Sequence, residues 1–452
     1  MSIHAYSTPG VYREESVPVE ALGIRTGVPV FVGFVERERD PQTKGKGPDT
    51  VPKPCRLTRW DQFRSVVGRA HTDGYLDYAV RGFFENGGER CVVLPLRMAD
   101  GDAFEELRRV FAEGGPLDDI EDADLVCIPD AMMQNICRIP SSLPIAEPYL
   151  EEARRLVYEV HRAVLEHCHR MGDRFAILDA VPIRREGSTG MGMGEPAIQA
   201  LLEHWRALVP REGALYCPWL RAQPRSPGSA APAADDPGDR GSTAEPRWSV
   251  RRRREQRGIL VPPCGHVAGI YARSDMRIGV HKAPANEVVD GAWDLEADIT
   301  DQDQGALNEV GVNCLRSIPG RGIRVWGART LSRHAAGRYV NVQRLFLTFA
   351  RWARRNFDDQ IFEPNGPALW ERVRFRLRSY CQQLFERGAL KGNSPAEAYY
   401  VKCDAETNPR EAREAGRMVA EIGLAPVAPA EFVIVRITQT SAGVSVSVPA
   451  SA

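Results

Sequence analysis

The chain has 452 residues, of which 43% are hydrophobic, and its 59 Lys and Arg nearly balance 60 Asp and Glu, for a formal net charge of -1. This length predicts two or three domains with a sizeable core, and the balanced charge argues against a dedicated nucleic-acid-binding protein. No stretch approaches the roughly 18 apolar residues that span a bilayer, and the segment from Met1 to Tyr6 is not a secretory signal. We therefore expect cytoplasmic assembly without membrane insertion.

Residues 1–25 are predicted to form an extended arm. Pro9, Gly10 and Pro18 interrupt any helix. The β-prone residues of the arm are Val11, Tyr12, Val17 and Val19. A buried strand is expected next, from Gly27 to Val35.

The middle of the chain alternates apolar runs with amphipathic stretches. The strands that we predict are Cys91–Leu96, Asp124–Pro129, Phe175–Ala180, Leu215–Trp219 and His266–Ala272. The predicted helices are Leu76–Asn86, Ala103–Glu113, Pro148–Arg170 and Pro196–Leu208. This alternation indicates an α/β fold with a mostly parallel sheet flanked by helices. Residues 221–248 interrupt it with a Pro-, Ala- and Asp-rich segment, which we expect to be a mobile surface loop.

The composition shifts from Ala283 onward. Two strong helices are predicted, Tyr339–Asn356 and Pro367–Gly388, followed by a helix at Pro409–Ile422 and a strand at Glu431–Thr438. The predicted organisation is an arm (1–25), an α/β domain (26–281), an α+β C-terminal domain (282–428), and a C-terminal strand with its tail (429–452).

A metal or phosphate site is not supported by the spacing of candidate residues. His161, His167, Cys168 and His169 form the richest ionisable cluster, but adjacent helical positions point about 100° apart and cannot converge on one zinc ion. The ten cysteines include no C-x-x-C pair, so we expect reduced, buried thiols. The glycine-rich run at 187–194 matches neither a Walker A motif nor a dinucleotide-binding fingerprint. We expect no cofactor and no metal.

Two other functional classes remain open from the residues alone. An α/β enzyme could use Asp130, Asp179 and His266, which lie near predicted strand ends, where such folds place catalytic groups. A binding protein could use the basic run Arg251–Arg254, although a solvated loop flank is the favoured interpretation of that run.

Several segments in the C-terminal third resemble the phage tail sheath family, which includes the sheaths of contractile injection systems. The matching segments, in family order, are KAPAN (Lys282–Asn286), IPGRGIRVWGARTL (Ile318–Leu331), YVNV (Tyr339–Val342), FEPN (Phe362–Asn365), Gln382–Leu390, AYYVKC (Ala398–Cys403) and PAEFVI (Pro429–Ile434). TPGVYREE (Thr8–Glu15) also resembles the family's opening.

The resemblance implies a non-enzymatic polymer. Its partners would be other copies of the chain, an inner tube protein, and baseplate and terminal cap proteins. The particle would stay in the cytoplasm, be released on lysis, or form part of a virion tail. The terminal segments would link subunits by adding strands to a small sheet in a neighbour; the alternative is that both segments pair within their own chain. The linking residues of the C-terminal strand would be Phe432, Val433, Ile434, Val435 and Ile437.

The resemblance also implies that C-terminal helices face the inner tube. Arg344, Arg351 and Arg355 share one side of the first strong helix, opposite Val342, Phe346, Phe349 and Ala353. On the second helix, Phe375 lies between Arg374 and Arg378, away from a predicted core stripe of Leu369, Val373, Leu377, Tyr380 and Leu384. Either arginine set could meet acidic groups on a tube, or could be a solvated face with intrachain ion pairs.

Overall fold

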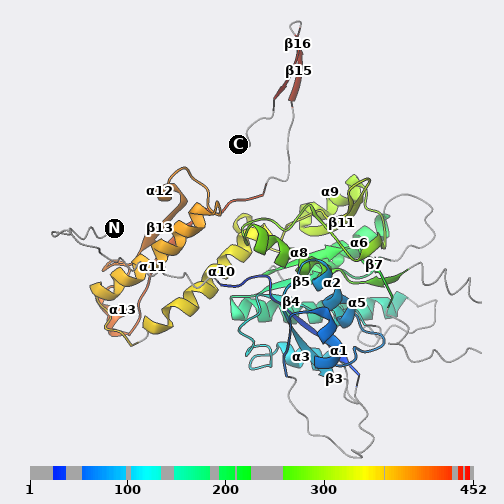
Figure 1. Cartoon of the computed structure of the whole chain (residues 1–452), viewed down its shortest axis with the longest axis horizontal. Coiled ribbons are helices and arrows are strands. Elements are labelled where there is room, and N and C mark those ends of the chain that lie inside the picture. The colour runs from blue at the N-terminus through cyan, green and yellow to red at the C-terminus, as the bar shows by residue number, and fades with distance from the viewer. Residues whose placement is uncertain are drawn as a thin grey trace, which may run out of the picture.

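The computed structural model describes residues 24–36, 53–97, 103–133, 147–183, 193–208, 211–224, 258–360, 362–429, 436–440 and 443–447. These residues form an α/β body and a smaller C-terminal unit, with helix α10 (Val340–Phe357) running between them (Figure 1). None of the helices in these ranges is long and apolar enough to cross a membrane.

A nine-stranded sheet forms the centre of the body, in the order β2-β3-β1-β4-β5-β6-β11-β12-β9. The six strands from β3 to β11 run parallel to their neighbours, and β2, β12 and β9 pair antiparallel at the two edges. The bounds are β1 Pro29–Val35, β2 Cys55–Leu57, β3 Cys91–Arg97, β4 Leu125–Cys127, β5 Phe175–Asp179, β6 Gly213–Cys217, β9 Glu287–Val288, β11 Val312–Ile318 and β12 Gly322–Val325. The predicted parallel, two-sided sheet is confirmed.

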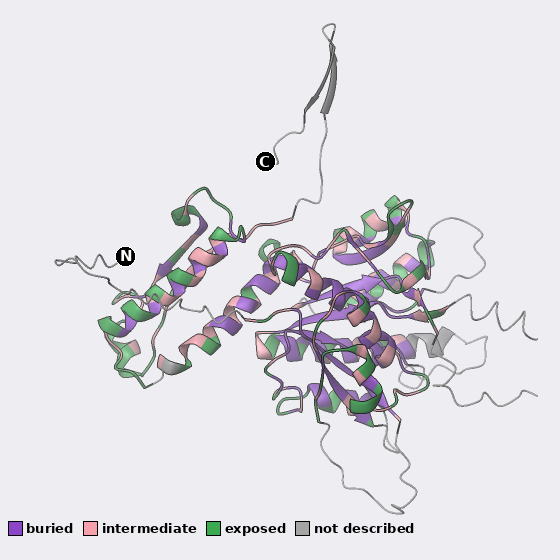
Figure 2. Cartoon of the chain, viewed as in Figure 1, coloured by how far each residue is buried: buried purple, intermediate pink, exposed green. Residues whose placement is uncertain are grey.

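Helices cover both faces of this sheet, which is why its strands are apolar on both sides (Figure 2). One face carries α3 (Ala103–Phe111), α5 (Glu147–Met171), α6 (Glu195–Ala207) and α9 (Asp301–Val310). The other carries α1 (Phe63–Val66), α2 (Leu76–Glu85) and α8 (Cys264–Arg277). The short 3-10 helices are η1 Trp60–Gln62, η2 Pro129–Met132, η3 Ala335–Gly337 and η4 Asp358–Gln360.

Helix α8 corrects the sequence prediction of a strand at His266–Ala272. All seven of these residues are buried, so their apolar run carried no helical periodicity that could distinguish a covered helix from a strand. Gly265 and Gly269 let α8 approach α2 closely: a Cβ on Gly265 would lie 2.1 Å from the Ala79 carbonyl oxygen, and one on Gly269 would lie 2.4 Å from that of Phe83.

A three-stranded antiparallel sheet, in the order β10-β7-β8, lies beside the main sheet. Its strands are β7 Leu220–Ala222, β8 Ile259–Val261 and β10 Ala292–Leu295. Ala222 pairs with Ile259 across β7 and β8, so the long low-complexity insertion joins two neighbouring strands. Residues 225–257 of that insertion, including the basic run Arg251–Arg254, lie outside the described residues.

The predicted domain boundary at residue 282 is corrected by the sheet order. Strands β9, β11 and β12 all follow that position in sequence, yet they extend the sheet of the α/β body. The chain leaves the sheet only after β12, where it passes through η3 into α10.

The C-terminal unit is built on α10 and α11 (Pro367–Glu386), with α12 (Pro395–Ala398), α13 (Arg410–Glu414) and the antiparallel pair β13 (Tyr399–Lys402) and β14 (Glu421–Leu424). Trp352 and Tyr380 stack at 4.1 Å in its core. The predicted core stripe of α11 is confirmed, since Leu369, Val373, Leu377 and Leu384 are buried and Tyr380 packs beside them. The predicted helix Pro409–Ile422 was too long: it ends at Glu414, and Glu421 already belongs to β14.

The last described segment is a hairpin of β15 (Arg436–Thr440) and β16 (Gly443–Ser447). Ile437 lies in β15, opposite Val446. The other predicted linking residues lie outside the described residues: Val11, Tyr12, Val17, Val19, Phe432, Val433, Ile434 and Val435.

Candidate functional site: an arginine junction between the body and the C-terminal unit

Helix α10 is attached to the body through the buried guanidinium of Arg344. Its Nη1 donates to Asp275 Oδ1 at 2.9 Å, and its Nη2 donates to Asp275 Oδ2 at 2.5 Å and to Asp124 Oδ2 at 3.2 Å. The guanidinium also lies 4.8 Å from the ring centroid of Tyr271, whose hydroxyl contacts that of Tyr216 at 2.7 Å. One side chain thus joins α10 to α8 and to the start of β4.

The guanidinium of Arg344 and the carboxylates of Asp275 and Asp124 are all buried away from water. Burial opposes the charged form of Arg344, but Asp275 and Asp124 outweigh that effect and raise the pKa of the guanidinium. Burial raises the pKa of Asp275, and Arg344 counteracts this. A buried charge is stable only when it is paired and hydrogen-bonded, so each of the three groups depends on the others.

Asp124 also fixes the segment that leads into β1. Its carboxylate accepts hydrogen bonds from the backbone of Gly27 at 3.0 Å and Val28 at 2.7 Å. Arg351 lies two helical turns beyond Arg344 on α10. Its guanidinium is 3.9 Å from the same carboxylate and donates to the carbonyl of Arg25 at 3.4 Å. The N-terminal segment therefore reaches the body between α10 and β4.

The outer part of the junction is a row of arginines that bind backbone carbonyls. Arg351 donates to the carbonyl of Asp122 at 3.4 Å, and Arg355 donates to that of Glu121 at 3.2 Å. Arg354 pairs with Asp173 at 2.6 Å and donates to the carbonyl of Met171 at 3.1 Å. These contacts seat α10 on two loops, one before β4 and one after α5.

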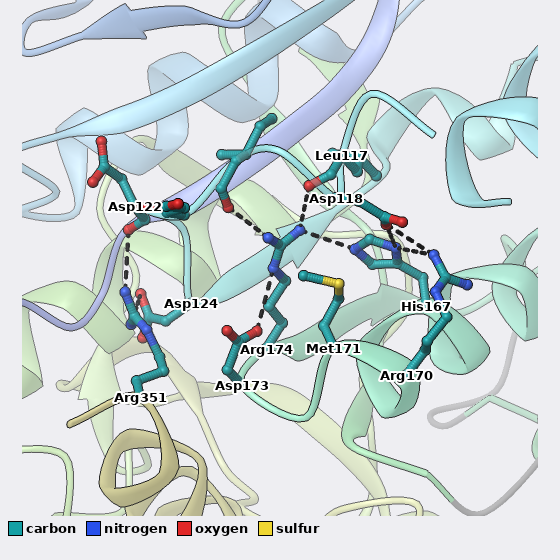
Figure 3. A network of polar contacts seen from close by, with 12 residues as sticks. Leu117, Asp118, Asp122, Asp124, His167, Arg170, Met171, Asp173, Arg174 and Arg351 are labelled. Carbon is teal, nitrogen blue, oxygen red and sulfur yellow. Dashed lines mark hydrogen bonds and ion pairs between the residues drawn. The ribbon is translucent and has the colours of Figure 1, made fainter. Parts of the chain in front are cut away.

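A second buried arginine holds the loop before β4 in place. Arg174 donates to the carbonyl of Leu117 at 2.6 Å and lies 3.0 Å from His167 Nε2; Figure 3 shows these two contacts side by side. It also donates to the carbonyl of Ile120 at 2.5 Å, while Asp118 pairs with Arg170 at 2.8 Å. The loop that receives α10 is thereby fixed to the end of α5.

These contacts correct part of the predicted tube-facing surface. Arg344 and Arg351 are 2% and 4% exposed and point into the chain, so neither can reach another protein from this position. The predicted stripe does share one side of α10, but two of its three arginines are buried there. The opposite side is largely covered as well: Val342 is buried, Phe349 and Ala353 pack against the core of the C-terminal unit, and Phe346 is 43% exposed. Arg355 is exposed and lies beside Asp122 at 3.9 Å.

The second predicted surface, on α11, does face outward. Phe375 is 70% exposed, and Arg378 is exposed. Arg374 is partly covered and forms an ion pair with Glu371 on the same helix. The structure thus presents an aromatic ring between two arginines, on the side of α11 away from the core of the C-terminal unit.

The three residues of the enzyme alternative serve as buried structural contacts. Asp130 accepts from the backbone of Phe34 at 2.7 Å and of Tyr75 at 2.6 Å, at the start of α2. Asp179 accepts from Cys264 at 2.7 Å, at the start of α8. Burial raises the pKa of each carboxyl to about 7 and lowers the pKa of His266 to about 4. The two carboxylates hold two helix N-termini, a structural task that commits their oxygens.

The histidine cluster is also divided among separate contacts. His161 Nδ1 lies 3.1 Å from His204 Nε2 on α6, and burial lowers the pKa of His161 to about 3. His167 faces Arg174 and Asp118, and His169 faces Glu212. All nine cysteines in the described ranges are free, and eight of them are buried, as predicted for reduced thiols; Cys137 lies outside those ranges.

Two family models match the chain consecutively. The phage tail sheath protein central domain matches residues 213–331, and the phage tail sheath C-terminal domain matches residues 334–440. The chain belongs to the phage tail sheath family, a class of structural sheath proteins, as its sequence segments predicted. The boundary between the two matched regions lies in the connection between β12 and α10.

Solved sheath structures cover nearly the whole chain. The anti-feeding prophage helical sheath in its contracted state is 26% identical, with a TM-score of 0.64, over 96% of this chain and 100% of that one. A second match is the sheath complex of PVC, an extracellular contractile injection system, in its contracted state. It is also 26% identical, with a TM-score of 0.64, over 97% of this chain and 99% of that one.

The curated relatives match only a part of this chain. The tail sheath protein of Salmonella phage ViI is 28% identical over 174 residues, which are 37% of this chain and 26% of the relative. The tail sheath protein of Vibrio phage KVP40 (isolate Vibrio parahaemolyticus/Japan/Matsuzaki/1991) is 23% identical over 189 residues, which are 41% of this chain and 27% of the relative. The matches thus span about a quarter of the length of these curated relatives.

Proposed function

We propose that this chain is the sheath subunit of a contractile injection device, and that it polymerises around an inner tube and contracts to drive the tube through a target envelope. The observation that carries the proposal is the end-to-end similarity to contracted sheaths at 26% identity. A baseplate assembly of the anti-feeding prophage contains a similar chain, which supports a baseplate protein as one partner, and a terminal cap protein would close the other end. Assembly would take place in the cytoplasm.

The proposed function requires no catalysis by this chain. The strand-end carboxylates of Asp130 and Asp179 hold backbone amides, and His266 is buried in the packing of α8 against α2. The energy for contraction would come from contacts that differ between the extended and contracted lattices.

The C-terminal unit offers an acceptor for the linking arms. Within the described residues, β13 and β14 pair only with each other, which leaves two strand edges for main-chain pairing. Both terminal segments start at this unit: Ile24 packs against its core, and Val427 donates to the carbonyl of Ala389 at 3.1 Å. Each added backbone hydrogen bond would contribute about 0.5–1.5 kcal/mol, and pairing through a tether tolerates rotation of the bodies.

Deleting residues 1–20 tests the N-terminal arm. The deletion leaves the contacts of Gly27 and Val28 with Asp124 intact, so we expect a folded subunit with unchanged thermal unfolding. That subunit should form no sheaths when it is expressed with its inner tube protein, as judged by negative-stain electron microscopy. Normal polymerisation of the truncated chain would contradict the linking role.

The α11 surface is the proposed contact with the inner tube. An aromatic side chain flanked by arginines is typical of a binding hot spot. Helix α11 contains four arginines and two glutamates, so an acidic tube surface would complement it. Contacts of this kind weaken with salt, which suits an interaction that must release when the sheath contracts.

Charge reversal tests this contact. We expect the variant R374E/R378E to fold but to lose most co-assembly with the inner tube, measured by co-sedimentation, because two attractions become repulsions. The matched control is R108E/R109E on α3, which makes the same charge change and also breaks i,i+3 ion pairs, with Glu105 and Glu106. Equal co-assembly of the two variants would exclude the α11 contact.

A further inference from the structure

Four asparagines are buried in the described part of the chain, at positions 86, 313, 341 and 408. Three of them bind both the backbone N–H and the carbonyl of one distant residue, as a paired strand would. Asn86 Nδ2 donates to the carbonyl of Asp290 at 2.9 Å, and the Asp290 N–H donates to Asn86 Oδ1 at 2.9 Å. The same two bonds join Asn313 to Arg329, both at 2.7 Å. They also join Asn408 to Val419, at 2.9 Å to the carbonyl and 2.6 Å from the N–H. We call this arrangement a closed clamp.

Asn341 forms only half of such a clamp. Its Nδ2 donates to the carbonyl of Val427 at 3.0 Å and to that of His281 at 2.8 Å. Its Oδ1 is buried and has no hydrogen-bond partner. The N–H of Val427, which would close the clamp, instead donates to the carbonyl of Ala389 at 3.1 Å.

The orientation of the Asn341 amide is fixed by its partners. Both groups bound to Nδ2 are carbonyls, which can only accept, so exchanging the oxygen and nitrogen would leave two acceptors facing each other. The unpartnered atom is therefore an acceptor, and it can be satisfied only by a donor. Buried acceptors in folded proteins are almost always paired.

The position of this half-closed clamp matters for the C-terminal segment. Asn341 lies in the first turn of α10, and Arg344, which joins α10 to the body, follows one turn later. Val427 immediately precedes the segment that continues toward β15. Asn341 therefore ties the root of the C-terminal arm to the same helix that carries the junction.

We propose that Asn341 is a positioning residue for the C-terminal arm, and that its clamp closes when the arm binds a neighbouring copy of the chain. In the free subunit the N–H of Val427 binds Ala389. In the assembled sheath the same N–H moves to Asn341 Oδ1, which turns the segment after Val427 in a new direction. One donor is exchanged between two acceptors, so the two arrangements are nearly balanced and the binding of the arm decides between them. This inference rests on the proposed linking function.

Amide exchange at Val427 tests the proposal. A peptide covering residues 425–429 reports only three amides, because Pro426 and Pro429 have none. In the wild type we expect assembly to slow exchange at Val427 at least about tenfold, since a closed clamp protects it further. N341A keeps the bond from the Val427 N–H to Ala389 but loses the one from Asn341 to the Val427 carbonyl, so each variant is compared with its own free subunit. Assembly of N341A should give no such additional protection at Val427. The control N86A opens a closed clamp in the body and should keep the protection at Val427.

Three outcomes separate this inference from the proposed function. Equal protection at Val427 in wild-type and N341A sheaths overturns the clamp. If N341A does not fold, a wild-type sheath structure decides: Val427 N bound to Asn341 Oδ1 supports the clamp, and Val427 N still bound to Ala389 in both lattice states overturns it. Normal sheaths from a chain ending at Ala428 would instead contradict the linking role of the C-terminal arm.

Discussion

Replacing Arg344 with methionine is expected to lower the free energy of unfolding by about 3–5 kcal/mol, the typical cost of removing one partner from a buried ion pair. The substitution removes three hydrogen bonds and leaves the buried carboxylate of Asp275 without its cation, while Asp124 keeps only Arg351, at 3.9 Å. Since these contacts join α10 to the body, the C-terminal unit should detach first.

Chemical denaturation of R344M measures this effect directly. The control R354M removes an exposed pair with Asp173 and should change stability by less than about 1 kcal/mol. The double variant R344M/D275L removes both members of the bidentate pair and should recover part of the loss, because apolar replacements avoid an unpaired buried charge. A loss under about 1 kcal/mol for R344M would show that the junction does not hold α10.

The substitution G265A is expected to cost about 3 kcal/mol or more, at the upper end for overpacked cores. The added methyl group would lie 2.1 Å from the Ala79 carbonyl oxygen and 2.4 Å from its Cα. Backbone atoms of a helix cannot rotate away as a side chain can, so α8 and α2 must separate. Their separation would disturb the core on that face of the sheet.

A glycine in open space provides the matched control. Gly305 lies inside α9, and a Cβ added there would meet no atom within 4 Å beyond its chain neighbours and the adjacent backbone of its own helix. G305A should therefore stabilise the chain by about 0.5–1 kcal/mol through helix propensity. Thermal unfolding of the two variants should therefore shift in opposite directions. A G265A variant as stable as the wild type would mean that the two helices are not in close backbone contact.

Much of the fold could be predicted because its signals are local. Apolar runs bounded by turns predicted β1, β3, β4, β5 and β6, and Pro367 and Gly388 predicted the limits of α11 to within two residues. The prediction failed at α8, where burial on all sides removes the periodicity that distinguishes a helix. It also failed at residue 282, because strand pairing between distant segments leaves no local signal.

The candidate site shows the same division. The 344–351–355 spacing correctly placed three arginines on one side of α10, but a sequence does not show whether that side meets water or carboxylates. The partners Asp275 and Asp124 lie 69 and 220 residues away. Only the fold brings them together, whereas the exposed Phe375 could be predicted from the core stripe on its own helix.

Negative-stain electron microscopy of the chain expressed with its inner tube protein tests the sheath function most directly. We expect long, straight, regularly striated tubes of sheath around the inner tube, and short wide tubes after contraction. A chain that stays monomeric at every concentration, with the inner tube left bare, would contradict the proposed function.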